Sequence, residues 1–337
     1  KAAMEIISKA DVVLALGTRL NPFSTLPGYG INYWPKDAKL IQVEINPDRI
    51  GLTKQVDVAI QGDARLVAER ILDTLAPGAG DTGRQARRDL VADTRSRWLQ
   101  TLASMDHEDD DPGTTWNAEA RDRDPDHMSP RMAWRAIQAG LPEDAIISTD
   151  IGNNCAIGNA YPTFEQGRKY LAAGLFGPCG YAFPAIIGAK IGCPDTPVVG
   201  FAGDGAFGIS MSEMSSIGRE EWPGITMVIF RNYQWGAEKR NSILWFDNNF
   251  VGTELDRELS FAKVAGACGF RGVQVRTMEE LSQALAASCE AQKEGTTTFI
   301  EVLLNQELGE PFRRDAMKKP VEVAGVRRED MRPQQPA

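Results

Sequence analysis

The stretch Val-Val-Gly-Phe-Ala-Gly-Asp-Gly at residues 198–205 is followed, after an interval, by Met-Val-Ile-Phe-Arg-Asn-Tyr-Gln at residues 227–234. Apolar residues at 198–202 and 225–230 predict a buried strand in each stretch. Polar residues end both strands, and residues 210–219 between them predict a helix. Because ligands of open parallel sheets lie beyond the carboxyl ends of the strands, these two strand ends predict one binding site.

The polar residues at the two strand ends suit a metal ion and a phosphate. Gly203 and Gly205 have no Cβ, so backbone N–H groups there can approach a phosphate closely. Mg²⁺ prefers octahedral oxygen ligands, and we expect the Asp204 carboxylate, the Asn232 amide oxygen and a backbone carbonyl near Gln234 to supply them. Gly-Asp-Gly alone is also typical of a strand-to-helix turn in which the aspartate caps the helix.

The composition indicates two domains and small-molecule ligands. With 337 residues and 42% apolar content, the chain can form two domains with cores of their own. A net charge of −9 argues against nucleic acid or an anionic membrane as partners, so an anionic ligand needs a local basic cluster. Five scattered cysteines argue against a zinc site or a disulfide framework. Because the sequence has neither an apolar run of about 18 to 20 residues nor a signal segment at its start, we expect a cytoplasmic protein.

Shifts in composition along the chain predict four segments. Residues 1–75 alternate strands and helices and form part of a doubly wound, Rossmann-like domain. Residues 76–128, rich in Gly, Pro, Asp and Arg, form a linker. Residues 129–305 form a second doubly wound domain, and residues 306–337 form a Pro-rich and charged tail. Near-continuous apolar strands joined by helices predict mostly parallel sheets, so we expect the α/β class.

Local patterns place further elements in these segments. A helix begins after Ser129, with Pro130 directly behind the capping residue. The other expected elements are strands at residues 11–16, 40–45, 56–60, 145–149 and 298–304 and helices at residues 64–75, 84–105, 181–191 and 278–293.

Gly-Asp-Gly, then the 26 residues 206–231, then Asn resembles the cofactor motif of the thiamine-diphosphate-dependent enzymes. In this resemblance residues 1–75 correspond to the larger part of the middle domain, and residues 129–305 to the diphosphate-binding domain. It implies thiamine diphosphate and Mg²⁺ as cofactors, with Asp204, Asn232 and Gln234 at the metal. The residues that it implies for cofactor binding are Gly152, Asn153, Asn154, Cys179, Gly203, Asp204, Gly205, Ala206 and Asn232.

Three parts of this assignment have ordinary alternatives. Asn153 and Asn154 can equally form an Asx-rich turn. Cys179 stands where relatives carry a larger apolar residue that wedges the bent cofactor; it can replace that residue as a small hydrophobe or be a buried cysteine without this role. The middle domain lacks the Gly-x-Gly-x-x-Gly fingerprint, so we expect it to be structural, with nucleotide binding as the alternative.

Within this superfamily, three short sequence motifs resemble those of the sulfoacetaldehyde acetyltransferases. They are residues 179–184, residues 231–241 and Gly-Glu-Pro-Phe-Arg-Arg-Asp-Ala at residues 309–316. The resemblance implies conversion of sulfoacetaldehyde and phosphate to acetyl phosphate and sulfite in taurine or sulfonate degradation. The alternatives are an enzyme of the acetolactate synthase or 2-oxo acid decarboxylase type, or a non-catalytic remnant that binds the cofactor.

The substrates of this reaction carry sulfonate and phosphate groups, which guanidinium and ammonium groups bind. We expect Arg313, Arg314, Lys239 and Arg240 as candidates, with a solvated basic loop and tail as the alternative. In this superfamily a pyrimidine-binding domain supplies the activating glutamate to a partner chain. We expect the sequence to be a fragment without this domain, so none of its residues can be assigned as the activating glutamate. We expect the complete protein to be a homodimer or homotetramer.

Overall fold

A computed structural model of the chain describes residues 1–21, 25, 30–32, 34–80, 82–105, 115–164, 167, 169–174, 176–218 and 222–308. The described residues fall into two compact units, one within Lys1–Met105 and one within Asp106–Phe312. This division into two units does not test the domain boundaries predicted from the sequence, which remain a prediction.

The first unit is built on a small parallel sheet. Its strands pair in the order β1-β2-β3, all parallel. The helix α2 begins after Asp63, whose carboxylate accepts hydrogen bonds from the backbone N–H groups of Arg65 and Leu66. The elements are α1 Ala2–Ile7, β1 Val12–Leu16, β2 Lys39–Glu44, η2 Pro47–Arg49, β3 Val58–Gln61, α2 Ala64–Thr74 and α3 Arg84–Ser104. The three strands and two helices expected here are therefore confirmed, to within about two residues at each end.

The second unit contains a six-stranded sheet in the order β5-β4-β6-β7-β9-β8, again all parallel. This confirms the predicted α/β class with doubly wound parallel sheets. The strands are β4 Ile146–Thr149, β5 Tyr170–Ala172, β6 Val198–Gly203, β7 Thr226–Arg231, β8 Arg271–Val275 and β9 Thr298–Leu303. The helices are α4 Thr115–Arg123, α5 Pro130–Gly140, α6 Asn153–Gly158, α7 Ala182–Gly192, α8 Asp204–Ser210, η3 Met211–Glu213, α9 Met214–Ile217, α10 Gly236–Trp245, α11 Phe261–Ala267, α12 Met278–Ala291 and η4 Gln292–Glu294.

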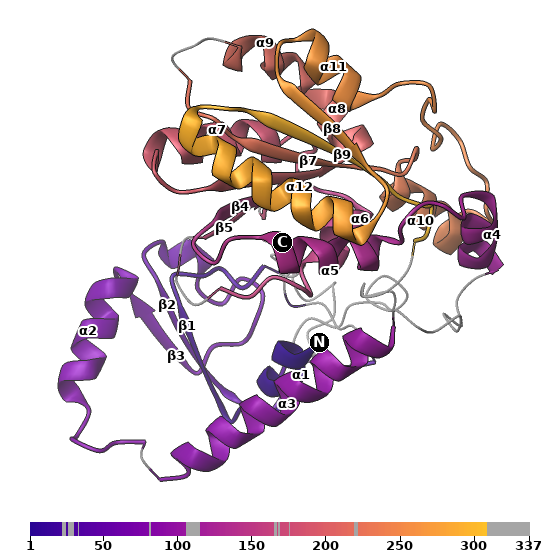
Figure 1. The fold of residues 1–337 in the computed structure, drawn as a ribbon. Coiled ribbons are helices and arrows are strands. Elements are labelled where there is room, and N and C mark those ends of the chain that lie inside the picture. Colours follow the sequence, from indigo (N-terminus) through magenta and orange to yellow (C-terminus); the bar gives the residue numbers. More distant parts are fainter. Residues whose placement is uncertain are drawn as a thin grey trace, which may run out of the picture. The chain divides into compact units, whose positions relative to one another are not determined.

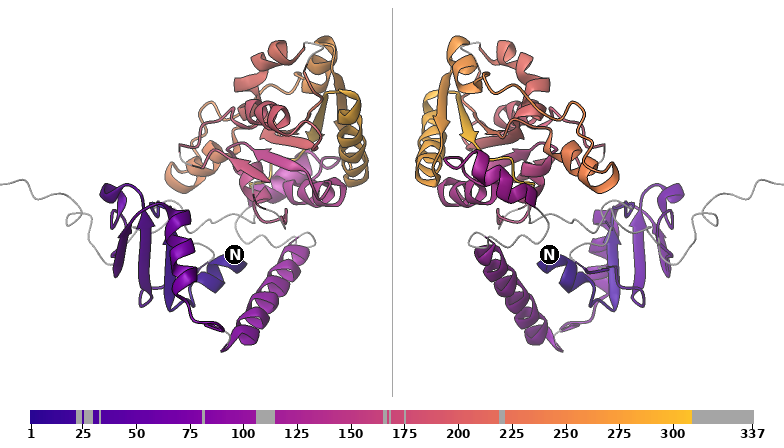
Figure 2. Two further views of the ribbon diagram at one scale, coloured as in Figure 1. Left: turned by 90° about the vertical axis from the view of Figure 1, so that its left-hand side faces the viewer. Right: turned by 90° about the vertical axis from the view of Figure 1, so that its right-hand side faces the viewer.

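Helices cover both faces of the six-stranded sheet (Figures 1 and 2). Met227 of β7 and Phe299 of β9 are neighbours in register and belong to a buried cluster with residues of α7, α8 and α11. Side chains alternate along a strand, so the residues next to Met227 and Phe299 on their own strands face the opposite side of the sheet. There Trp134 of α5 packs on Phe201 and Phe230, with ring centroids 4.9 and 5.3 Å apart. Helix α12 runs beside α5 on this face (Figure 1).

The segment between the two motif strands differs from the prediction. The predicted start of the helix at residues 210–219 is wrong. Helix α8 already begins at Asp204, and η3 and α9 follow it. Gly203 is the capping residue, so Asp204 is the first helical residue and not the cap. The ring of Phe207 packs among three other phenylalanines of the core. This packing stabilises a helix that its glycines disfavour.

Candidate functional site

A pocket lies at the carboxyl ends of β4, β6 and β7, as the sequence predicts. Its walls come from the residues that follow these strands and from the turn before α7. It is lined by Ile151, Gly152, Asn153, Asn154, Cys155, Cys179, Gly203, Asp204, Gly205, Ala206, Asn232, Gln234, Trp235, Gly236, Ala237 and Glu238. All residues expected to bind the cofactor or the metal therefore share one pocket, while their roles remain a proposal.

Asp204 lies at the base of this pocket and is 2% exposed. Its Oδ1 accepts a hydrogen bond from the N–H of Gly205 at 2.9 Å, while Oδ2 accepts from Nη1 of Arg231 at 3.0 Å and from the N–H of Tyr233 at 2.7 Å. Burial raises the pKa of Asp204 to about 6, although the charge of Arg231 and these hydrogen bonds act in the opposite direction. Burial thus disfavours the ionised form, which a cation in the pocket would stabilise further.

Arg231 is the residue that sequence reasoning missed. It ends β7, directly before Asn232, and its side chain is 1% exposed. The available signal was a charged residue at the end of an otherwise apolar strand, since a buried charge requires an opposite charge nearby. The sequence did not reveal that this opposite charge belongs to Asp204.

Several buried polar atoms of the pocket have no hydrogen-bond partner within the described part of the chain. They are Nδ2 and Oδ1 of Asn153, Oδ1 of Asn154 and Oε1 of Gln234. Buried polar groups are normally hydrogen-bonded, so such a cluster indicates a polar ligand. Amide N–H groups suit phosphate oxygens and amide oxygens suit Mg²⁺, so these side chains fit a metal diphosphate.

The loop that carries Cys179 is held by Asp150 at the end of β4. The Asp150 carboxylate accepts hydrogen bonds from the N–H groups of Ile151, Gly180 and Ala182 at 2.8 to 3.0 Å. Burial raises the pKa of the Cys179 thiol above its ordinary value. A neutral, half-buried thiol in the pocket wall behaves as a small apolar group, which is compatible with the predicted packing role.

Two of the four predicted anion binders lie outside this pocket. Lys239 and Arg240 are buried on α10, and neither is among the described residues that line the pocket. The Lys239 ammonium forms an ion pair with Glu254, and burial lowers its pKa. Arg313 and Arg314 lie outside the described residues.

The described residues show neither a second metal site nor a membrane-spanning helix. They contain no cluster of three or more His, Cys, Asp or Glu side chains that could hold a metal ion, and we expect Mg²⁺ to need only one carboxylate here. Among the same residues, none of the helices is long and apolar enough to cross a bilayer.

Comparison with known families decides which cofactor chemistry this pocket belongs to. Residues 150–302 match the family "Thiamine pyrophosphate enzyme, C-terminal TPP binding domain", and residues 1–71 match "Thiamine pyrophosphate enzyme, central domain". The chain belongs to the thiamine pyrophosphate enzymes. Thiamine pyrophosphate is another name for thiamine diphosphate, so the resemblance drawn from the sequence is confirmed.

Relatives that are 69 to 75% identical to this chain share one name. A protein of Rhizobium meliloti named "Probable sulfoacetaldehyde acetyltransferase" is 75% identical over 334 residues, which are 99% of this chain and 56% of that protein. The "Sulfoacetaldehyde acetyltransferase" of Roseovarius nubinhibens is 71% identical over 335 residues, with the same coverage. The chain thus spans about half the length of the curated relatives it matches.

A solved structure of another thiamine pyrophosphate enzyme has the same fold. The thiamine diphosphate-dependent 4-hydroxybenzoylformate decarboxylase of Rhodococcus jostii RHA1 superposes with a TM-score of 0.63 at 19% sequence identity. The match covers 89% of this chain and 50% of that enzyme. At this identity the similarity supports the fold alone.

Proposed function

We propose that this chain carries the diphosphate-binding half of an active site that converts sulfoacetaldehyde and phosphate to acetyl phosphate and sulfite. The observation that carries the proposal is the pocket, which combines the buried carboxylate of Asp204 with buried amide atoms that have no hydrogen-bond partner in the described structure: both amide atoms of Asn153 and the amide oxygens of Asn154 and Gln234. The choice of substrate rests on relatives at 71% and 75% identity that are named for this reaction. Taurine or sulfonate degradation is the setting in which we place it.

The chain's own residues divide the work of holding the cofactor. Asp204, Asn232 and a carbonyl near Gln234 hold Mg²⁺, and Asn153 and Asn154 hydrogen-bond the diphosphate. Gly152, Gly203, Gly205 and Ala206 form the pocket wall without bulky side chains, and Cys179 packs against the cofactor rings. When bound, thiamine diphosphate supplies an electron sink for cleavage next to the aldehyde carbon.

Product analysis tests the reaction. With thiamine diphosphate, Mg²⁺ and a pyrimidine-binding domain that supplies the other half of the active site, the purified protein should release sulfite from sulfoacetaldehyde in phosphate buffer and form an equal amount of acetyl phosphate. Consumption of pyruvate with formation of acetolactate, or decarboxylation of a 2-oxo acid without sulfite release, would instead support the alternative enzyme types.

Cofactor binding and turnover, measured together, separate an enzyme from a non-catalytic remnant that binds the cofactor. Thiamine diphosphate with Mg²⁺ should raise the midpoint of thermal unfolding, and Asp204→Ala should abolish that increase. A protein whose unfolding midpoint rises in this way but that turns over none of the substrates above would be the cofactor-binding remnant. A midpoint that the cofactor and the metal leave unchanged would reject the metal-diphosphate site.

Basic residues complete the proposed site. We propose that Arg313 or Arg314 binds the sulfonate or phosphate, with Lys239 and Arg240 as further candidates, because the chain as a whole carries a net charge of −9. Steady-state kinetics of Arg313→Ala and Arg314→Ala should show a raised KM for at least one substrate. Unchanged dependence on both substrates in both variants would contradict this assignment.

We also propose an oligomeric state and a cellular compartment for the protein. Active sites of this superfamily form between two chains, so we propose a homodimer or homotetramer, which light scattering of the purified protein would test. All five cysteines are free. This fits a reducing compartment, and we propose the cytoplasm.

A further inference from the structure

Arg231 connects the proposed metal site to the core of the second unit. Its Nη1 lies 3.0 Å from Oδ2 of Asp204, and its Nε lies 3.8 Å from Oε1 of Glu301 on β9. Its Nη2 donates to the backbone carbonyl oxygens of Asp256 and Leu259. The guanidinium therefore has partners on several segments of the chain, and its planar fork fixes its orientation among them.

Two aromatic rings also contact the guanidinium of Arg231. The guanidinium carbon lies 4.4 Å from the ring centroid of Tyr233 and 5.4 Å from that of Phe261. Both distances are in the range of cation–π attraction. Because the group is buried, these contacts leave Arg231 little freedom to move.

The contacts of Asp204 differ between its two oxygens. Oδ2 accepts two hydrogen bonds, from Arg231 and from the N–H of Tyr233, whereas Oδ1 accepts one from the adjacent N–H of Gly205. A carboxylate oxygen has two lone pairs, so Oδ2 is saturated and Oδ1 keeps one for a further ligand. Asn232, which stands between Arg231 and Tyr233 in the sequence, lines the same pocket.

The charges around Arg231 make this arrangement compatible with a cation. A lone guanidinium beside a metal ligand would repel a divalent ion. Glu301 offsets that charge, so the buried group of Asp204, Arg231 and Glu301 keeps a formal charge of −1. Glu301 is itself fixed by hydrogen bonds from Ser260, Phe261, Ala262 and Gln274.

We propose that Arg231 is a positioning residue for the divalent cation: it occupies Oδ2 of Asp204 and thereby presents Oδ1 to the metal. This inference rests on the proposed metal site at Asp204. Without the guanidinium, the Asp204 carboxylate can rotate and loses the charge that keeps it in place. Groups that orient a metal ligand commonly change metal affinity by about 10- to 100-fold when they are removed.

Mn²⁺ binding tests the inference without reference to turnover. Mn²⁺ is titrated into the purified protein with saturating thiamine diphosphate, and the free ion is measured by electron paramagnetic resonance. Arg231→Met should raise the Kd for Mn²⁺ about tenfold or more. Arg231→Lys restores the charge but not the fork, so its Kd should lie between those of Arg231→Met and the unmodified protein.

Arg257 provides the matched control. Its guanidinium carbon lies 4.7 Å from the centroid of the same Tyr233 ring, but it pairs with Asp124 instead of Asp204. Arg257→Met removes a comparable cation–π contact and an ion pair, and the Kd for Mn²⁺ should stay within about twofold. Circular dichroism establishes which variants fold; if Arg231→Met does not, Arg231→Lys decides the test.

The outcomes are distinct. A folded Arg231 variant with an unchanged or lower Kd for Mn²⁺ would overturn the inference, and so would an equal loss of affinity in Arg257→Met. An unmodified protein that binds no Mn²⁺ would reject the metal site and the inference together. Mn²⁺ binding that depends on Arg231 in a protein that releases no sulfite would reject only the proposed reaction.

Discussion

The indole of Trp235 lies directly against Gly205, the second glycine of the Gly-Asp-Gly motif. A Cβ at Gly205 would come within 2.9 Å of the indole atoms Cδ2 and Cε2, a distance that carbon atoms do not tolerate. Both residues line the pocket. The packing of Trp235 therefore requires a glycine here, in addition to the proposed approach of a phosphate.

Gly205→Ala should consequently destabilise the fold, because either Trp235 or the start of α8 must shift. We expect a loss of about 1 to 3 kcal/mol in the free energy of unfolding, together with a smaller thermal stabilisation by thiamine diphosphate and Mg²⁺. Urea unfolding and thermal unfolding with and without the cofactor measure the two effects.

Gly208 provides the control within the same helix. In the described structure, a Cβ built there meets no atom within 4 Å apart from its chain neighbours and the backbone of its own helix. Gly208→Ala should leave stability unchanged or raise it by up to about 1 kcal/mol, since alanine favours a helix. Equal stability of Gly205→Ala and the unmodified protein would contradict the packing argument.

The ion pair between Asp124 and Arg257 predicts a pH dependence of stability. Partial burial acts to raise the pKa of Asp124, but the hydrogen bonds from Arg257 at 2.9 and 3.2 Å and its charge outweigh burial, so the pKa is lowered. A carboxyl group whose pKa is lower in the folded state stabilises the fold above its unfolded pKa, near 3.9. That contribution is lost as the pH falls through the folded pKa.

Asp124→Asn should therefore be less stable than the unmodified protein at neutral pH, by about 1 kcal/mol or less because Arg257 is partly exposed. The difference should shrink as the pH falls below about 4. Urea unfolding of both proteins over a series of pH values measures it. A difference that grows on acidification would show that the sign is wrong.

Gln292 of η4 satisfies the backbone at the start of β6. Its Oε1 accepts from the N–H of Val198, and its Nε2 donates to the Val198 carbonyl and to Oγ1 of Thr226, at 2.8 to 3.0 Å. Gln292→Leu would remove these buried hydrogen bonds from the Val198 backbone and from Thr226, which keeps its bond to Ser288, so we expect a loss of about 2 to 4 kcal/mol in the free energy of unfolding.

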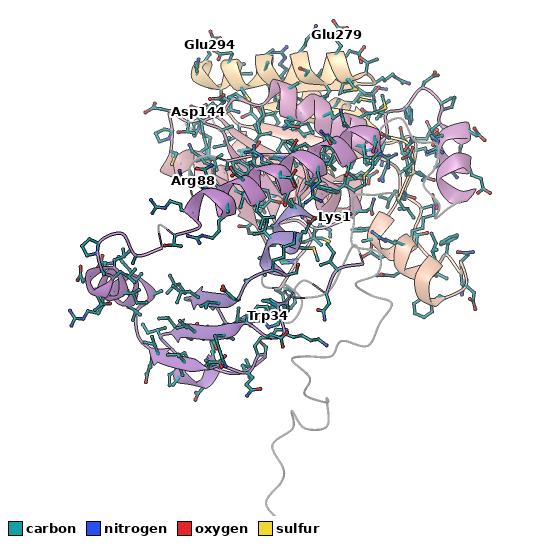
Figure 3. All side chains as sticks on the ribbon, turned by 90° about the horizontal axis from the view of Figure 1, so that it is seen from below. Lys1, Trp34, Arg88, Asp144, Glu279 and Glu294 are labelled. Atoms are coloured by element: carbon teal, nitrogen blue, oxygen red, sulfur yellow. The ribbon has the colours of Figure 1, made fainter. Side chains whose placement is uncertain are left out.

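Gln283→Leu in the preceding helix α12 is the control for this change. Gln283 is exposed and hydrogen-bonds Glu279, whose side chain projects away from the sheet in Figure 3, as does that of Glu294. Its replacement should change stability by no more than about 0.5 kcal/mol. Similar losses in both variants would point to the introduced leucine and not to the lost hydrogen bonds of Gln292.

The sequence predicted the parts of the fold that depend on local patterns. Apolar runs such as 225–230 identified the buried strands because both faces of a parallel sheet are covered. Topology then placed Asp204 and Asn232 at one edge, since both follow strands of the same sheet. The strand β5, Tyr170–Ala172, was not predicted because three residues carry too little pattern.

The sequence did not predict which residues form ion pairs with residues distant in the chain. The ion pair of Arg231 with Asp204 joins residues far apart in the chain, and nothing near either residue indicates the other. Lys239 was expected as a candidate anion binder, with a solvated basic loop as the alternative, yet its side chain is buried and paired with Glu254. Charge alone does not tell whether a lysine on a short helix faces solvent, because burial depends on which segment packs over it.

Trp134 supports the pocket from the core. Its Nε1 donates to the backbone carbonyl of Asn154 at 2.7 Å, and the indole fills the space next to Gly158. Trp134→Phe keeps an aromatic ring but removes the indole hydrogen bond to this carbonyl, so we expect a loss of about 1 kcal/mol in the free energy of unfolding. Because Asn154 lines the pocket, thermal stabilisation by thiamine diphosphate and Mg²⁺ should also fall. Trp222→Phe removes a part-buried indole elsewhere in the core and should leave the cofactor effect intact; an equal fall in both variants would mean that the hydrogen bond to Asn154 does not support the site.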